Sequence, residues 1–271
     1  MKTILITGSS TGIGKATAIY FAEKGWNVAA TMRNTENGKD LSAYPHVKVL
    51  VLDVMNQASI DKAIEETIAL FGRIDVLFNN AGYALVGAFE AMSEEQIKKQ
   101  FDTNVFGVMN VTRAILPYFR NKRSGTIINT TSMGGLFTFP LYSVYHATKW
   151  ALEGFMESLH YELKPFNIRV KNIEPGAIRT DFYDRSLQLV SMAAYDAYVK
   201  TAHHNMLNAT ANASNAEVVA KEVFKAATDN NFRLRYPVGG GSSLLLFIRK
   251  LVPLNIFFAL MRWQVEKGFK K

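Results

Sequence analysis

A tyrosine and a lysine stand four positions apart, Tyr145 and Lys149, within the stretch SVYHATK. The flanking sequence predicts a helix here. Residues at i and i+4 share one helical face, so the phenol oxygen and the ammonium group can point at the same place. A cation within ~4 to 6 Å favours the ionised form of a phenol, whose ordinary pKa is about 10. Because Tyr and Lys also meet at this spacing by chance, the surrounding elements decide between chemistry and packing.

A glycine-rich loop, TGSSTGIG, follows the first apolar run and carries Gly8, Gly12 and Gly14. Glycines at such a place permit a tight turn and let backbone amides approach a pyrophosphate. The start of the following helix supplies N–H groups and the positive end of its dipole. The spacing G-x-x-x-G-x-G differs from the G-x-G-x-x-G dinucleotide fingerprint, but it stands between the first strand and the first helix, where that fingerprint belongs.

The same loop also matches the G-x-S-x-G elbow of serine hydrolases, with Ser10 as the nucleophile. This alternative requires a later histidine, for which His203 or His204 is available. A nucleophile at residue 10 would leave little of the sheet ahead of it in the chain. A dinucleotide loop gives all three glycines a role, whereas the elbow leaves Gly14 without one.

Two residues at strand ends bear on which nucleotide would bind. The second strand ends in AATMRN, so Arg33 stands where an NAD enzyme would carry an acidic residue for the ribose hydroxyl. A guanidinium group there suits a 2′-phosphate through charge-assisted hydrogen bonds. NADP(H) is therefore preferred, and NAD(H) is possible if Arg33 is only a solvated loop residue. Asp53 ends the third strand, where it could contact the adenine side or cap the next helix.

Short apolar runs alternate with longer amphipathic runs along the first two thirds of the chain. The apolar runs predict strands at 2–7, 27–32, 47–53, 74–80, 125–132 and 168–175. The amphipathic runs predict helices at 13–25, 58–72, 93–120 and 144–166. Strands of nearly continuous apolar content that alternate with helices are typical of parallel βαβ units. The sequence therefore predicts the α/β class, as a single Rossmann-type doubly wound parallel sheet with helices on both faces.

Residues 1–271 are predicted to form one catalytic domain, because no linker, repeat or low-complexity segment divides the chain. Residues 181–212 depart from the alternation as a helical excursion of mixed polarity, which we interpret as a substrate lid. Residues 244–271 form an apolar and basic C-terminal helical segment. A peripheral membrane contact is possible for this segment, but cover for the substrate cleft or a subunit contact is favoured.

Composition and charge distribution exclude several classes of protein. The chain has no cysteine, hence no disulfide or thiolate-held metal, and a cytoplasmic location is expected. Of the net charge of +8, residues from Arg249 onward carry +5, so the body has no basic stripe for nucleic acid. No uncharged apolar run reaches the ~20 residues of a membrane-spanning helix. The histidines show no ligand spacing with carboxylates, so no metal site is predicted.

Several motifs occur together in one order: the glycine loop, NNAG at 79–82, Ser132, the Tyr145/Lys149 pair and PGAIRT at 175–180. In this combination the sequence resembles the short-chain dehydrogenase/reductase family, and the TMRN segment and the C-terminal RYPVGGGSSLLLFIRKLVP are similar to its hydroxysteroid and retinol dehydrogenase branch. The resemblance implies a nicotinamide cofactor and reversible hydride transfer between an alcohol and a ketone or aldehyde.

The resemblance also implies residue roles. Tyr145 would be the general acid/base, and Lys149 would lower its pKa and hold the cofactor ribose. Ser132 would donate a hydrogen bond to the developing oxyanion. Asn104 would anchor a proton-relaying water, unless it is a buried asparagine that satisfies a distorted helix. Cofactor contacts are expected from Gly8, Ser10, Thr11, Gly12, Ile13, Gly14, Arg33, Asp53, Val54, Asn80, Ala81, Gly82, Tyr145, Lys149, Pro175, Gly176, Ile178 and Thr180.

The expected partner is a small alcohol or carbonyl compound. An apolar lid favours a lipophilic one, with Phe182, Met192 and Met206 as candidate lining residues. By the same resemblance a homodimer or homotetramer is expected. A non-enzymatic alternative is a cofactor-sensing protein without turnover, because a fold alone does not determine function. All four catalytic positions are filled here, which favours an enzyme.

Overall fold

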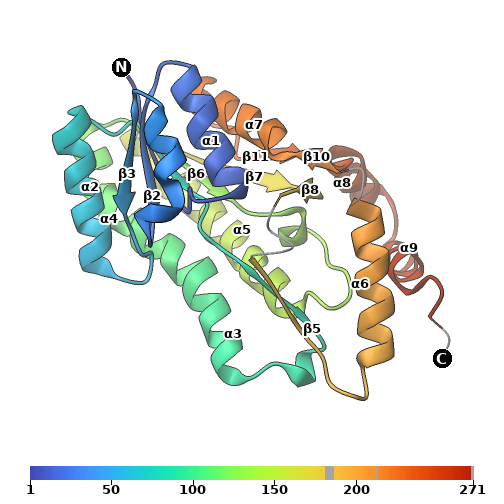
Figure 1. Ribbon diagram of the computed structural model, residues 1–271. Helices are drawn as coiled ribbons and strands as arrows, with labels where there is room; N and C mark the ends of the chain where they lie inside the picture. The colour runs from blue at the N-terminus through green and yellow to red at the C-terminus, as the bar shows by residue number, and fades with distance from the viewer. Residues whose placement is uncertain (181–185, 211–212, 270–271) are drawn as a thin grey trace.

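A sheet of seven parallel strands forms the centre of the computed structural model, which describes residues 1–180, 186–210 and 213–269 (Figure 1). Its strand order is β11-β7-β6-β4-β1-β2-β3. The strands are β1 (Thr3–Thr7), β2 (Asn27–Met32), β3 (Val47–Val51), β4 (Val76–Asn79), β6 (Gly125–Thr130), β7 (Ile168–Pro175) and β11 (Arg235–Val238). In register, Leu5 of β1 pairs with Ala29 on one side and Leu77 on the other. Successive strands are added on one side of β1 as far as β3 and then on its other side from β4 to β11, which confirms the doubly wound prediction.

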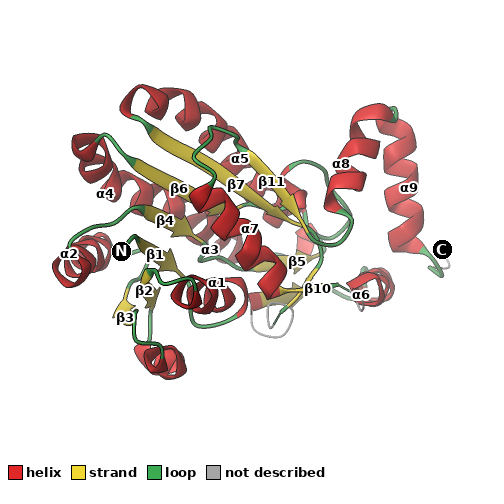
Figure 2. Ribbon diagram, turned by 90° about the horizontal axis from the view of Figure 1, so that it is seen from above, coloured by secondary structure: helices red, strands yellow, loops and turns green. Residues whose placement is uncertain are grey.

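Helices cover both faces of the sheet (Figures 1 and 2). One face carries α1 (Gly12–Glu23) and α7 (Ala216–Thr228), and the other carries α2 (Gln57–Phe71), α4 (Gly107–Lys122) and α5 (Ser143–Leu163). Alternate strand residues point to opposite faces, so Ile4 and Ile6 join the first core layer and Leu5 joins the second. This double cover explains why the strand sequences are apolar throughout.

The start of α2 settles one of the alternatives raised by the sequence. Asn56 is the N-cap of this helix, and its side chain accepts a hydrogen bond from the Ser59 amide. The proposal that Asp53 caps the helix is therefore wrong. The helix ends at Gly72, whose φ of +76° is the left-handed conformation that glycine adopts without steric cost.

The single helix predicted over residues 93–120 is divided in the structure. It comprises α3 (Glu94–Phe101), a π-helical turn at Asp102–Phe106 and then α4. Ser93 and Gln96 form a capping box at the start of α3. The wider turn contains Asn104, and π-helical turns inside α-helices often mark functional places.

Several short strands were not predicted. The edge strand β11 spans four residues and contains Pro237, a residue that parallel strands accept at a sheet edge. Two small parallel pairs lie beside the main sheet, β5 (Ala84–Gly87) with β9 (Leu187–Val190), and β8 (Ile178–Arg179) with β10 (Ser214–Asn215). Short helical turns complete the connections: η1 (Thr35–Ala43), η2 (Phe89–Ala91), η4 (Met133–Gly135) and η5 (Lys164–Phe166).

The C-terminal third places three helices at the β11 side of the molecule. The predicted excursion 181–212 contains β9 and α6 (Asp196–Thr210), and α6 packs against α9 (Leu254–Glu266). The apolar segment 244–271 contains most of α8 (Ser242–Leu251) and all of α9, and the two helices are separated at Pro253. Both stand clear of the sheet in Figure 2. None of the helices in the described ranges is long and apolar enough to cross a bilayer.

Candidate active site

A cavity of about 1020 Å³ lies along the carboxyl ends of the central strands. Its wall takes residues from the segment that follows each strand of the sheet. These are Gly8 after β1, Arg33 after β2, Asp53 after β3, Asn80 after β4, Ser132 after β6, Gly176 after β7 and Gly240 after β11. A parallel sheet thus gathers into one cavity residues that are far apart in the sequence.

The glycine loop keeps its shape through close packing against Asn80. The Asn80 side-chain amide donates to the carbonyl oxygens of Thr7 and Gly8 at 3.1 and 3.0 Å. A Cβ on Gly14 would lie 2.2 Å from the Gly8 oxygen and 2.6 Å from Asn80 Nδ2, so only glycine fits there. Thr11, the N-cap of α1, makes no side-chain capping bond with any residue that the structure describes. The first amide groups of α1 therefore remain available to an anion.

Tyr145 and Lys149, on α5, both line this cavity. The Lys149 ammonium lies 5.7 Å from the centre of the Tyr145 ring and donates to the Thr130 carbonyl oxygen at 2.8 Å. Burial lowers the pKa of Lys149 to about 8, and the carboxylate of Glu153 one turn further along α5 opposes that decrease. The chain thus places a cation near the tyrosine at the carboxyl end of the sheet.

Ser132 caps the short turn η4 after β6, and its Oγ accepts a hydrogen bond from the Gly134 amide at 2.9 Å. A hydroxyl that accepts a bond in this way retains its own proton to donate. Ser132 and Tyr145 line the same cavity.

Asn104 lies behind the cavity wall, with only 1% of its surface exposed. Its side chain accepts from the Tyr83 amide at 3.1 Å and donates to the Tyr83 carbonyl oxygen at 2.8 Å. A further bond joins Asn104 Nδ2 to Thr148 Oγ1 at 3.4 Å. These contacts agree with the structural alternative for Asn104, although the backbone that it satisfies belongs to Tyr83 and not to the π-helical turn.

The other residues that were expected to contact a cofactor lie around the same cavity. Apart from Gly14, which packs behind the loop, every residue expected to contact a cofactor lines the cavity. Arg33 is exposed at its rim. Asp53 also lines it, and its Oδ1 accepts from the Met55 amide at 2.9 Å.

Much of the apolar lining was not predicted. The connection from Ser132 to α5 contributes Met133, Phe137, Phe139 and Tyr142, a run whose apolar content is visible in the sequence. Helix α9 contributes Leu260, Met261, Trp263, Gln264 and Val265. The predicted lid contributes Ser186, Gln188 and Met206. Met192 is 39% exposed and is not among the lining residues, and Phe182 lies outside the described residues.

The serine-hydrolase arrangement is not assembled around Ser10. Ser10 lines the cavity, but neither His203 nor His204 is among the lining residues that the structure describes. His204 instead contacts the amide of Asn208 at 2.9 Å on α6. Within the described ranges, no group of three or more His, Cys, Asp or Glu side chains is placed to hold a metal ion.

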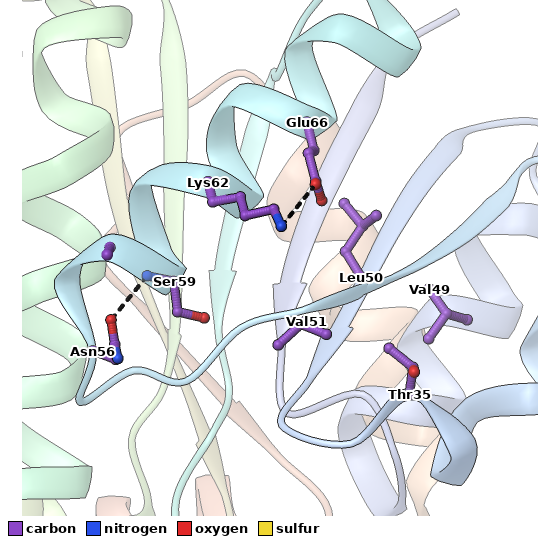
Figure 3. A pocket seen from close by; sticks show the side chains of 9 residues that line it. Thr35, Val49, Leu50, Val51, Asn56, Ser59, Lys62 and Glu66 are labelled. Carbon is purple, nitrogen blue, oxygen red and sulfur yellow. Dashed lines mark hydrogen bonds and ion pairs between the residues drawn. The ribbon is translucent and has the colours of Figure 1, made fainter.

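A second cavity, of about 520 Å³, lies between the edge strand β3 and helix α2 (Figure 3). Among its polar side chains, Asn56 binds the Ser59 amide and Lys62 lies 3.7 Å from Glu66. It contains none of the predicted site residues. The chemistry-bearing residues therefore belong to the larger cavity.

Comparisons with known proteins agree with this arrangement. A family model described as short chain dehydrogenase matches residues 2–188. The 3-ketodihydrosphingosine reductase of Bacteroides thetaiotaomicron is 45% identical over 185 residues, which cover 68% of this chain and 66% of that protein. A short-chain dehydrogenase from Streptomyces avermitilis has 34% identity and a TM-score of 0.83, covering 100% of this chain and 99% of the other. The structure of ElxO with NADP bound has 28% identity and a TM-score of 0.76, covering 90% and 99%. The chain therefore belongs to the short-chain dehydrogenase family and is an oxidoreductase of that family.

Proposed function

We propose that this protein is an NADP(H)-dependent oxidoreductase that interconverts an alcohol and a ketone or aldehyde of a lipophilic compound, with Tyr145 as general acid/base. One observation carries the proposal. Tyr145, Lys149 and Ser132 line the same continuous cavity as the glycine loop and Arg33. A cofactor held by the loop and a substrate held by the apolar lining would therefore meet beside the tyrosine.

The residues present fit a dinucleotide phosphate. The glycine loop is packed too tightly for side chains at Gly8 and Gly14, where a Cβ would lie 2.8 Å from Ala81 Cα and 2.2 Å from the Gly8 oxygen. The open amides of α1 suit the pyrophosphate, and the exposed Arg33 suits a 2′-phosphate. The NADP in the ElxO structure supports this choice. When bound, the nicotinamide supplies a hydride to a carbonyl carbon or accepts one from an alcohol.

Tyr145 would move the proton that accompanies this hydride. To act as a base near neutral pH, its pKa must fall by about three from the ordinary value of about 10, which corresponds to about 4 kcal/mol. One cation within reach typically lowers a pKa by about one to three, so the Lys149 ammonium would supply between a third and all of the change. Tyr145 then gives its proton to the carbonyl oxygen in reduction and takes it back in oxidation.

Ser132 would hold the reacting oxygen while the proton moves. Its hydroxyl is oriented by the Gly134 amide, so its proton can be directed at the oxygen on which negative charge develops. The aromatic and aliphatic lining from Met133, Phe137, Phe139 and α9 would exclude water and bind an apolar chain or ring. The name of the 3-ketodihydrosphingosine reductase relative supports a lipophilic ketone as the substrate class.

The substitution Tyr145→Phe tests the proposal. We expect turnover of NADPH with a panel of long-chain and cyclic ketones to fall by about a thousandfold or more, because the proton donor is lost. The affinity for NADPH, measured by fluorescence titration, should change less than threefold. Retained turnover in the variant would refute the role of Tyr145. A wild-type protein that binds NADPH but reduces no carbonyl compound in the panel would instead indicate the cofactor-sensing alternative.

A further inference from the structure

The C-terminal helices carry an unusual number of exposed apolar side chains. On α8, Leu244, Phe247 and Leu251 are 64%, 60% and 67% exposed. They stand at i, i+3 and i+7, so they form one stripe along the helix. On α9, Ile256 and Trp263 are 49% and 64% exposed. We call these residues, together with Leu260, the α8–α9 apolar face.

The opposite sides of both helices are firmly seated on the body of the protein. Phe257 is fully buried and its ring lies 5.6 Å from that of Phe137, while Val265 is only 5% exposed. Leu246 and Ile248 of α8 pack against the same cluster. The outward side chains therefore belong to the surface of a folded unit, and apolar side chains that are exposed in groups mark interaction sites.

This face is continuous with the mouth of the cavity. Leu260 and Trp263 line the cavity, and they are also 47% and 64% exposed to solvent. They form its rim, so the apolar interior opens directly onto the α8–α9 apolar face. In Figure 2 the same two helices stand out from the sheet on the side of β11.

Charge distinguishes between possible occupants of this face. Residues 242–269 carry a net charge of +3. Arg262 and Lys267 are exposed, and Arg262 pairs with Glu266 at 3.1 Å. The Arg249 guanidinium instead lies 5.4 Å from the centre of the buried Phe257 ring. A second copy of the chain would bring two such basic surfaces together, which like-charge repulsion opposes. The headgroups of an anionic bilayer complement the cations, while the apolar stripe enters the acyl boundary. Trp263, with Lys267 5.9 Å from its ring, suits the interface between headgroups and acyl chains.

We propose that the α8–α9 apolar face docks onto the surface of an anionic membrane, so that the cavity mouth opens toward the bilayer. Docking itself depends only on this face. The consequence that a lipophilic substrate passes from the bilayer into the cavity without crossing water rests on the proposed function.

Co-sedimentation with lipid vesicles tests the docking without any turnover. The full chain is mixed with vesicles of phosphatidylcholine alone or of equal parts phosphatidylcholine and phosphatidylglycerol. We expect binding to the anionic vesicles to be about tenfold tighter or more, and to weaken with added salt. The triple variant Leu244→Gln, Phe247→Gln, Leu251→Gln and the charge variant Arg262→Glu, Lys267→Glu should each lose about tenfold or more in affinity.

A matched control uses apolar residues of similar exposure elsewhere, Leu70→Gln with Phe89→Gln, which are 50% and 63% exposed. This control should bind vesicles like the wild type, and circular dichroism should show all variants folded. Equal binding of the wild type and the triple variant would overturn the proposal, as would failure of the wild type to bind anionic vesicles. Light scattering that shows a wild-type oligomer and a monomeric triple variant, without vesicle binding, would identify a subunit interface instead.

Activity measurements distinguish a failure of the docking proposal from a failure of the oxidoreductase proposal. NADPH-dependent reduction of a short water-soluble ketone should be the same in the wild type and the triple variant, because none of the three residues lines the cavity. Reduction of a long-chain ketone embedded in anionic vesicles should fall about tenfold or more in the variant. Vesicle binding without turnover of either ketone would leave the docking intact and contradict the oxidoreductase proposal. Equal rates on the embedded ketone would contradict delivery from the bilayer.

Discussion

We propose that cofactor choice depends on the side chain that follows β2. Arg33 is exposed at the rim of the cavity, where the ribose of a bound dinucleotide is expected. Replacing it by alanine removes the only proposed contact to a 2′-phosphate but leaves the glycine loop unchanged. We expect Arg33→Ala to raise the KM for NADPH about tenfold or more and that for NADH less than twofold, since a charge-assisted hydrogen bond contributes about 1.5 to 3 kcal/mol.

Steady-state kinetics with both cofactors measure this difference. Lys15→Ala is a suitable control, because Lys15 is a cation on α1 that pairs with Asp40 at 2.5 Å and does not line the cavity. Equal increases in the two KM values for Arg33→Ala would contradict the phosphate contact.

The buried environment of Lys149 predicts a pH dependence. Burial lowers its pKa to about 8, and the anion of Glu153 opposes this decrease. Above that pH the ammonium loses its proton and its support for the Tyr145 phenolate, so oxidation of the alcohol should decline on the alkaline side. Glu153→Gln removes the opposing anion, which lowers the pKa of Lys149 further. The alkaline limb of the kcat/KM profile should therefore move to lower pH, and a rate profile over a range of pH values measures it.

Glu157→Gln provides the matched control for that experiment. Glu157 also binds Arg235, at 2.7 Å, but its side chain is 46% exposed, whereas Glu153 is 5% exposed and accepts from Arg235 at 3.1 Å. The alkaline limb of this control should stay in place. If both variants moved the limb equally, the effect would come from Arg235 and not from the field at Lys149.

At the scale of elements, helix α9 forms part of the wall of the larger cavity. It is attached through Phe257, which is fully buried against the loop that follows Ser132. Phe257→Ala should remove about 3 to 5 kcal/mol of packing free energy and loosen α9. Since the lining residues of α9 are mostly apolar and include none of the expected cofactor contacts, the KM for a lipophilic substrate should rise several-fold while that for NADPH stays unchanged.

The neighbouring residue offers a control for this experiment. Phe258 is 48% exposed, so Phe258→Ala should leave both constants close to wild type in lipid-free buffer. Kinetics with each substrate varied in turn give the two constants. A parallel increase in the KM for NADPH would show that α9 also shapes the cofactor site.

At the scale of the whole molecule, we expect stability to depend on groups remote from the cavity. Lys171 of β7 is fully buried and pairs with Asp229, which also accepts from the Tyr236 hydroxyl, near the start of β11. Asp229→Asn leaves a buried cation without its counter-charge, which typically costs about 3 to 5 kcal/mol. We expect the free energy of unfolding to fall by that amount while kcat/KM at a temperature where the variant is folded stays within twofold.

Chemical denaturation and kinetics on the same preparation measure both quantities. The control is Glu217→Gln, which breaks the surface pair with Lys221, whose two side chains are each 56% exposed. Exposed pairs of this kind contribute at most about 1 kcal/mol. A large loss of kcat/KM in folded Asp229→Asn protein would show that the Lys171–Asp229 pair is coupled to the cavity.

The sequence by itself determined the parts of this protein whose information is local. Strands buried on both faces need continuous apolar residues, and a tight turn against a packed helix needs glycine, so the fold class, six strands and the glycine loop could be recognised in order. The i, i+4 spacing was sufficient to place Tyr145 and Lys149 on one face of α5.

Only the tertiary structure decided the features that depend on partners distant in the chain. Strand β11, which contains Pro237, forms because it can pair with β7 at the edge of the sheet. The Asn104 side chain binds the Tyr83 backbone because the π-helical turn orients it in that direction. Helix α9 lines the cavity because Phe257 packs against a loop more than a hundred residues earlier in the chain. These contacts form through long-range packing, and residue type at a single position does not specify which distant surface it will meet.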